Sequence, residues 1–303
     1  MSHRLLIATY NLSIFAVFFP LNMAILWVIL RCKEFRNLWA YRVIAHIAVA
    51  DVVLLIVTAS AGLMTALGKE IPGFLTNVLF ATSISIKETQ FLLSLALAIN
   101  RFIVILRIDV LDKPALYHTL IAISWLTGIG MITAALMTLR SSEYVLLAFY
   151  FTGDFLFYKA YESIAFIFNI AVSGVSMLLY VIIILSINLK KKAVSRQEFY
   201  LFLQAIIPFL WLLTIEGLMY FKRSDAIDSA LFGLLFNLFQ RFVPAVHVII
   251  YLVFNRYGLM SGSFMSQLLG NYVEKWRSLL HFCGILWGVF SRRNPGSAGL
   301  REA

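Results

Sequence analysis

The sequence predicts an all-α membrane protein: a bundle of seven transmembrane helices, with the N-terminus outside and an interfacial helix near the C-terminus. The 303-residue chain is 61% hydrophobic and only 13% charged, whereas soluble domains carry roughly 25% charged residues. Its apolar stretches are also long enough to cross a hydrocarbon core of about 30 Å, which takes about 20 helical residues. Because backbone amides in lipid must be paired within their own segment, we expect these stretches to be helices.

Seven apolar stretches follow one another along the chain, and each is a predicted span. They lie at about 5–30, 43–67, 74–106, 118–139, 160–187, 199–221 and 230–254. No repeat of 20–50 residues is visible among them. We therefore predict a seven-transmembrane domain over residues 1–260, followed by a cytoplasmic tail over residues 261–303.

The basic residues give the predicted orientation. With the N-terminus outside, most of the 25 Lys and Arg residues fall on the cytoplasmic side, in 31–42, 101–113, 190–196 and the tail. Such a bias is the positive-inside pattern of multi-pass proteins, and we expect this protein in the plasma membrane. The net charge of +10 is then explained by anionic lipid of the inner leaflet, and no nucleic-acid partner is expected.

Two segments outside the spans are rich in aromatic residues. The loop at about 140–159 is dense in Tyr and Phe, and would form either an apolar lid or a belt at the membrane interface. The stretch 279–290 in the tail is largely apolar but too short to span. With Trp276 and Trp287, it predicts an amphipathic interfacial segment over about 265–290.

The sequence does not favour an enzyme. It has no Gly-rich phosphate loop, no paired His and Cys residues at metal-ligand spacing, and no nucleophile beside a plausible base. We therefore expect neither catalysis nor a cofactor.

Polar residues within the apolar spans mark the candidate sites, because a charge in the bilayer costs at least a few kcal/mol. Asp51 lies within the second span, in the phrase Ile-Ala-Val-Ala-Asp. The triplet Asn100-Arg101-Phe102 closes the third span, and the phrase from His247 to Tyr251 lies at the end of the seventh. These three phrases are where we expect the working parts of the protein.

In these phrases the chain resembles the rhodopsin-like seven-transmembrane G-protein-coupled receptors, over residues of about 5–260. Asn22 and Asp51 resemble the family's first-helix asparagine and its second-helix aspartate, which binds sodium or a water network. Arg101 resembles the arginine of the Asp/Glu-Arg-Tyr motif, although the triplet here is Asn-Arg-Phe. Trp125 resembles the fourth-helix tryptophan.

The later spans resemble the family less closely. Tyr180 resembles the fifth-helix tyrosine that turns inward on activation. Tyr251 resembles the tyrosine of Asn-Pro-x-x-Tyr, although His247-Val248 replaces the Asn-Pro pair. The family's usual disulfide and the sixth-helix Cys-Trp-x-Pro are missing from the sequence. In these departures the chain resembles the serpentine chemoreceptors of nematodes, classes T and X and their relatives.

The resemblance implies a chemosensory receptor that detects a small molecule and activates a heterotrimeric G protein. Coupling to the G protein would then involve Asn100, Arg101, Phe102, Tyr180 and Tyr251. A simpler interpretation of Arg101 is a basic anchor whose side chain reaches the headgroups. The runner-up function is a membrane transporter or a ligand-gated channel, but the matched broken spans of many transporters are not evident.

Two groups of intramembrane polar residues are predicted. The resemblance brings together Asn22, Asp51 and His247, which would hold water or a sodium ion. His247 would serve either as a neutral hydrogen-bonding group or as one that changes charge near physiological pH. The second group, which is the predicted ligand site, lies in the outer half and contains Lys87, Glu88, Glu216 and Arg241. Lys87 and Arg241 would bind an anionic ligand, or Glu88 and Glu216 would neutralise these two cations internally. The other expected class of ligand is an odorant.

Overall fold

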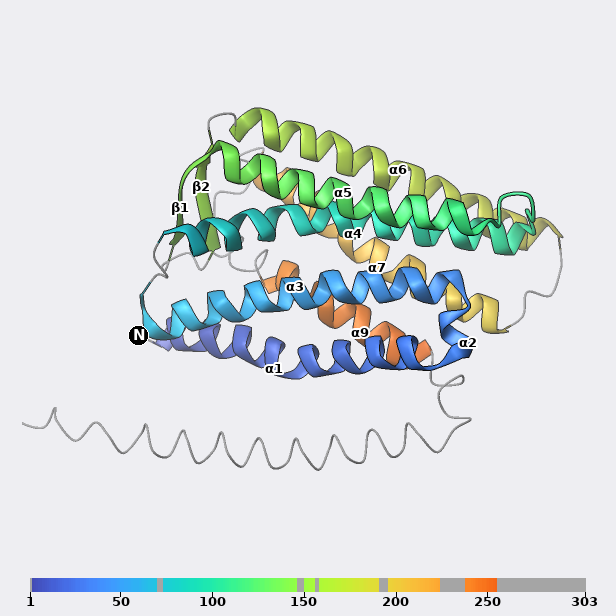
Figure 1. Cartoon of the computed structure of the whole chain (residues 1–303), viewed down its shortest axis with the longest axis horizontal. Helices are drawn as coiled ribbons and strands as arrows, with labels where there is room; N and C mark the ends of the chain where they lie inside the picture. Colours follow the sequence, from blue (N-terminus) through green and yellow to red (C-terminus); the bar gives the residue numbers. More distant parts are fainter. Residues whose placement is uncertain are drawn as a thin grey trace, which may run out of the picture. The chain divides into compact units, whose positions relative to one another are not determined.

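The computed structural model describes residues 2–69, 73–145, 150–155, 158–190, 196–223 and 238–254. The chain divides into two units, 1–254 and 255–303. The second unit, which includes the predicted tail and its amphipathic segment over 265–290, lies outside the described residues. The elements of the first unit are α1 (Ser2–Arg31), α2 (Lys33–Arg36), α3 (Trp39–Leu67), α4 (Phe74–Leu106), α5 (Pro114–Thr138), β1 (Leu139–Val145), β2 (Tyr150–Phe155), α6 (Tyr158–Lys190), α7 (Arg196–Arg223) and α9 (Val243–Phe254) (Figure 1).

Six of these helices are long and apolar enough to cross a membrane, which is the character of a multi-pass membrane protein. They are α1, α3, α4, α5, α6 and α7, and they coincide with the first six predicted spans to within a few residues. The sixth contains Pro208 and the first contains Pro20, and both helices continue through the proline. Length and composition were therefore sufficient to locate these six helices.

The seventh predicted span, 230–254, is not one continuous helix over its described part. Residues 238–241 are helical, Phe242 is a turn, and α9 begins at Val243 and is only 12 residues long. Pro244 explains the interruption, because proline has no N–H to continue a helical hydrogen-bond ladder and disfavours helical backbone in the residue before it. The residues at 224–237 lie outside the described part of the chain.

The segment predicted as an aromatic loop at 140–159 forms a hairpin instead. Strands β1 and β2 pair antiparallel, from Leu139 opposite Phe155 to Val145 opposite Tyr150, with an irregularity between Leu139 and Ser141. The hairpin joins α5 to α6 at one end of the helices (Figure 1). The helical class is therefore confirmed for the spans, and a short two-stranded sheet is added to it.

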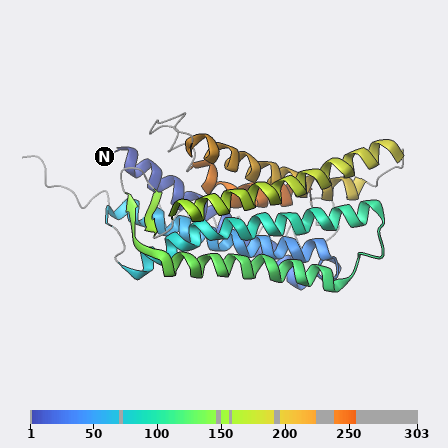
Figure 2. The ribbon, with the colours of Figure 1, turned by 90° about the horizontal axis from the view of Figure 1, so that it is seen from above.

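Helices α3 and α4 occupy the centre of the described bundle. Helix α1 packs on α3, while α4 contacts α3, α5, α6 and α7 (Figures 1 and 2). In the most apolar window of α4, 61% of the residues are buried, compared with 17% in α5. Large apolar side chains such as Leu126 and Ile167 are exposed on α5 and α6. A lipid environment accounts for such outward-facing apolar helices.

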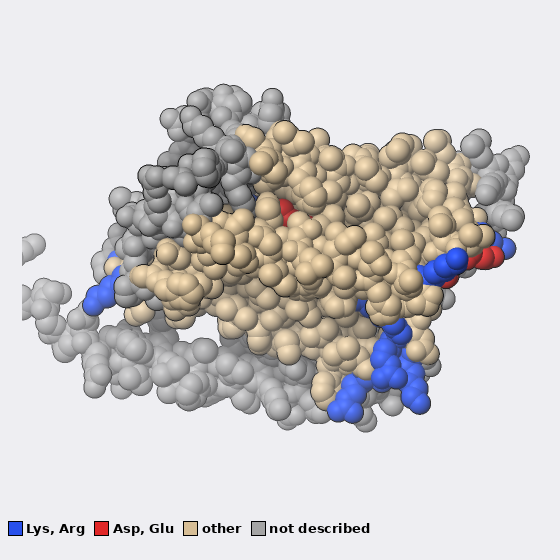
Figure 3. Space-filling view, turned by 45° about the horizontal axis from the view of Figure 1, so that its top comes forward, with Lys and Arg blue, Asp and Glu red and all other residues tan. Residues whose placement is uncertain are grey.

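Charged side chains of the described residues gather at the ends of the helices (Figure 3). One end carries the short helix α2 and the turn between α4 and α5. The guanidinium of Arg31 lies 4.3 Å from the Trp27 ring centroid, and that of Arg42 lies 4.2 Å from the Trp39 centroid. The opposite end has Arg4, whose side chain donates to carbonyls in the last turn of α3. The apolar belt between the two ends matches the expected membrane core.

Candidate functional site

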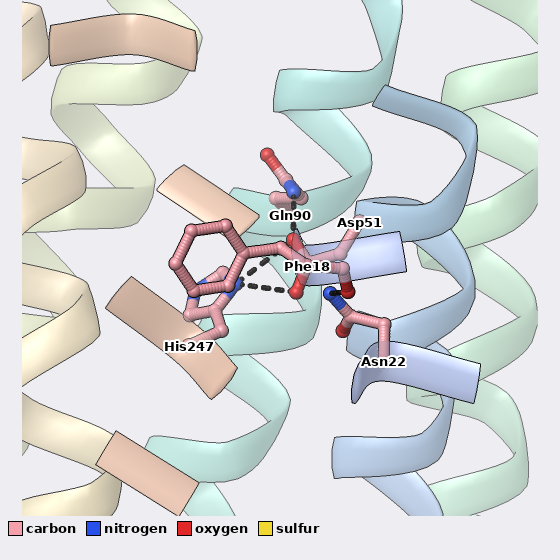
Figure 4. A network of polar contacts seen from close by, with 5 residues as sticks. All are labelled: Phe18, Asn22, Asp51, Gln90 and His247. Carbon is pink, nitrogen blue, oxygen red and sulfur yellow. Dashed lines mark hydrogen bonds and ion pairs between the residues drawn. The ribbon is translucent and has the colours of Figure 1, made fainter. Parts of the chain in front are cut away.

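A buried carboxylate on α3 is the centre of the first polar group. Asp51 is fully buried, and Nδ1 of His247 lies 2.9 Å from its Oδ1 and 2.8 Å from its Oδ2. Gln90 Nε2 on α4 donates to Oδ1 over 2.8 Å (Figure 4). We call Asp51, Gln90 and His247 the Asp51 cluster. With Asp51 ionised, both of its partners donate, so the buried charge is compensated by side chains of α4 and α9.

Asn22 lies beside this cluster but bonds differently from the prediction. Its side chain is fully buried, and its Nδ2 donates over 3.0 Å to the carbonyl oxygen of Phe18, one turn earlier on α1 (Figure 4). Direct contact with the carboxylate is therefore made by His247 and Gln90. Gln90 was missed in the sequence, although its position 11 residues before Arg101 puts both on one face of a helix.

The sodium ion suggested for this group stays a prediction. Gln90 and His247 present nitrogen atoms to the two carboxylate oxygens, while Gln90 Oε1 and Asn22 Oδ1 are buried and have no hydrogen-bond partner among the described residues. Within the described part of the chain, no group of three His, Cys, Asp or Glu residues could hold a metal ion. The Asp51 cluster is thus a hydrogen-bonded connection between helices α3, α4 and α9.

Arg101 lies near the last turn of α4 and is 4% exposed. Its charge acts on four tyrosines that come from four other helices. They are Tyr41 of α3, Tyr117 of α5, Tyr180 of α6 and Tyr251 of α9. Arg101 is therefore enclosed by the bundle, and its side chain does not extend to solvent as the simple anchor interpretation requires.

The residues beside Arg101 tie α4 to the neighbouring helix α5. The side chain of Asn100 hydrogen-bonds Tyr117, whose hydroxyl donates over 2.9 Å to Asp112 in the turn before α5. Phe102 is half-buried and packs against the apolar core at this end. Asn100 therefore connects the triplet to the α4–α5 turn, and Phe102 anchors it in the apolar core.

Tyr180 and Tyr251 have buried hydroxyls without a hydrogen-bond partner among the described residues. The Tyr180 ring packs 5.8 Å from Phe202 and 5.4 Å from Phe209, measured between ring centroids. The Tyr251 ring stacks on His247 at 6.2 Å. Since unsatisfied buried hydroxyls are costly, these two are the natural candidates to gain partners in another arrangement of the helices.

A second polar group lies between α4, α6 and α7. Asn169 Nδ2 donates to Glu216 Oε1 over 2.8 Å, and the same side chain hydrogen-bonds Glu88. All three are almost fully buried, at 4% exposed for Glu88, 3% for Asn169 and 7% for Glu216. We call these residues the Glu88 cluster. The structure therefore brings together the two acids of the predicted ligand site, with an amide from α6 between them.

The two predicted cations are placed differently. Lys87 is half-exposed and acts on Glu88 electrostatically, but as its chain neighbour it faces another side of α4. The charge of Arg241 acts on Tyr10 of α1, whose hydroxyl donates to the carbonyl of Leu238. Asn169 was missed in the sequence. Its signal is the spacing Asn169, Ser173, Ser176 and Tyr180, a polar stripe on one face of α6 that is buried throughout.

No protein-family model matches the chain, and no curated protein matches it.

Proposed function

We propose that this protein is a seven-transmembrane G-protein-coupled receptor, chemosensory in type and similar to the serpentine receptors of nematodes. It would detect a small molecule on its outer side and activate a heterotrimeric G protein on its inner side. The observation that carries the proposal is the burial of Arg101 near the end of α4, where its charge acts on tyrosines of α3, α5, α6 and α9. A buried arginine can be released when the helices move, whereas a simple lipid anchor extends to the headgroups.

The proposed orientation puts the Arg101 end in the cytoplasm and the N-terminus outside. Exposed basic residues at this end support it, namely Arg31, Lys33, Arg36, Arg107 and Lys113, because cytoplasmic loops carry an excess of Lys and Arg. In this arrangement α9 and the residues before it complete the seventh span. The same basic end would meet the anionic lipid of the inner leaflet of the plasma membrane.

The proposed signal passes along three helices from the outer half to Arg101. Helix α4 carries both Glu88 and Arg101, which are about 20 Å apart at 1.5 Å per residue. Helix α6 carries Asn169 and, three turns inward, Tyr180. A ligand that draws α6 and α7 toward α4 at one end would change the packing of Tyr180 and Tyr251 at the other end, where their hydroxyls have no partner among the described residues.

The decisive experiment compares Arg101→Ala with Arg107→Ala, a matched control in the exposed turn just beyond α4. Each chain carries an N-terminal epitope, and its labelling on intact cells both matches surface levels and tests the extracellular N-terminus. G-protein activation is then measured across small organic acids, amines and volatile odorants. We expect a response in the wild type and in Arg107→Ala, and at least a tenfold loss in Arg101→Ala.

Activity retained in Arg101→Ala would contradict the role of that arginine.

The second candidate function, a transporter or ligand-gated channel, is favoured by the buried acids Glu88 and Glu216 inside apolar helices, since intramembrane acids often mark ion pathways. Ligand-dependent ion flux without G-protein activation would support it and contradict the receptor.

A further inference from the structure

The Glu88 cluster has more hydrogen-bond acceptors than donors. Two carboxylates offer four oxygens, while the bridging Asn169 amide group supplies two N–H donors and a backbone N–H donates to Glu88. Glu88 Oε2 and Asn169 Oδ1 have no hydrogen-bond partner among the described residues, and both atoms are shielded from solvent. A buried carboxylate that lacks donors is strongly destabilised as an anion. The cluster therefore requires a proton or a positively charged group.

A second observation comes from the face of α6 that carries Asn169. Ser173, one turn further along this face, is 2% exposed and its hydroxyl has no partner within the described residues. This hydroxyl is therefore a second buried polar group without a partner on the face of α6 that carries Asn169, where an additional polar group could bind.

The surroundings of the cluster are apolar and aromatic. Buried Phe91, Val172 and Leu212, each one helical turn from a member of the cluster, belong to a core cluster against which Phe168 and Trp211 are packed. In Figure 3 a small patch of Asp or Glu atoms is visible among uncharged residues near the middle of one face. Apolar walls, aromatic rings and a few convergent polar groups are the ordinary composition of a small-molecule site.

We propose that Glu88, Asn169 and Glu216 form the binding site of a small organic cation, a protonated primary amine with an apolar body. An ammonium group has three N–H donors and no acceptor, which matches two carboxylates and the unpaired oxygen of Asn169. Its apolar body would lie against Phe168 and Trp211, whose ring faces also attract cations. This inference names the ligand class of the proposed receptor, and in that respect it rests on the proposed function. It replaces the anionic ligand expected at Lys87 and Arg241.

The experiment uses the purified full chain in lipid nanodiscs, with melting temperature as the readout. The probes are methylamine, butylamine and 2-phenylethylamine, each beside the alcohol of the same carbon skeleton. We expect at least one amine to raise the melting temperature by about 3 °C or more above its alcohol. Glu88→Gln and Glu216→Gln should each abolish the shift, while Asp109→Asn, an exposed acid in the α4–α5 turn, should keep it.

Melting without a probe shows that each variant is folded, and the two glutamine variants test the site independently. A proton shared between the carboxylates is the alternative that needs no ligand. It would leave no amine more effective than its alcohol, and this result would overturn the proposal, as would an unchanged amine response in both glutamine variants.

The outcomes also separate the site from the receptor function. Stabilisation by an amine without G-protein activation would retain the site and contradict the receptor. Activation of a G protein by a ligand without positive charge, undiminished in Glu88→Gln and Glu216→Gln, would retain the receptor and overturn the site.

Discussion

The two buried acid clusters of this bundle differ in how their charge is compensated. Asp51 has a donor on each side, from Gln90 and His247, at 2.8–2.9 Å. Glu88 and Glu216 share the side-chain amide of Asn169, and the Glu88 carboxylate also accepts a backbone hydrogen bond. Both oxygens of Asp51 have a side-chain partner, whereas Glu88 Oε2 has none among the described residues. The carboxylate of Asp51 is therefore joined to the neighbouring helices by side chains, and Glu88 is where an additional group is expected to bind.

Helix α4 contributes one residue to each of the two clusters, and these two residues are close together in the sequence. Glu88 and Gln90 are two residues apart, which is about 200° around a helix. Gln90 therefore faces α3 and α9, while Glu88 faces α6 and α7. Only a helix that is surrounded on most sides can bury polar residues on opposite faces, and the central position of α4 provides this.

The largest expected effect is at His247. The change His247→Leu removes the side chain that contacts both oxygens of a fully buried carboxylate, and leaving a buried charged group without its partner costs about 3 kcal/mol or more. We expect a clear fall in the melting temperature of the protein in nanodiscs. The variant His247→Asn keeps an amide donor at the same position and should lose less. Equal melting of the leucine variant and the wild type would contradict the assignment of a buried charged contact to Asp51.

A smaller effect is expected at the other donor to Asp51. Gln90→Met keeps the length of the side chain but removes the amide, and a hydrogen bond to a charged group contributes about 1.5–3 kcal/mol. The variant should therefore be destabilised by less than His247→Leu, measured by the same thermal melting. If the loss of stability in the double variant equals the sum of the two single losses, His247 and Gln90 act independently. A loss in the double variant that is smaller than this sum would show that they are coupled through Asp51.

Much of the bundle follows from the sequence because the bilayer dictates the length of an apolar helix. The bounds predicted for 74–106 coincide with those of α4. Two local features were not predicted. Pro244 interrupts the seventh span, so that α9 begins at Val243, and the aromatic segment after α5 forms a β-hairpin. Neither departure changes the apolar content of its segment, so hydropathy could not indicate it.

The candidate sites followed from the sequence only in part. Charged residues inside an apolar span are easily recognised, so the sequence predicts Asp51, Glu88 and Glu216 as site residues. Their amide partners, Gln90 and Asn169, carry no charge and cost less to bury. Which acid meets which amide depends on the rotation of α4, α6 and α7 about their axes. A single sequence does not specify that rotation, and for this reason the acids were expected to meet Lys87 and Arg241.

The smallest and most discriminating effect is expected at Glu88. Glu88→Gln removes a buried charge and adds two N–H donors beside Glu216, whose carboxylate can accept them. Without a bound amine, the variant should melt at the same temperature as the wild type or higher, with a change of about 1 kcal/mol or less. Its sign would then be opposite to that of His247→Leu, although both changes act on buried acid clusters. A loss comparable to that of His247→Leu would mean that Glu88 is already fully compensated within the chain, and the difference between the two clusters would disappear.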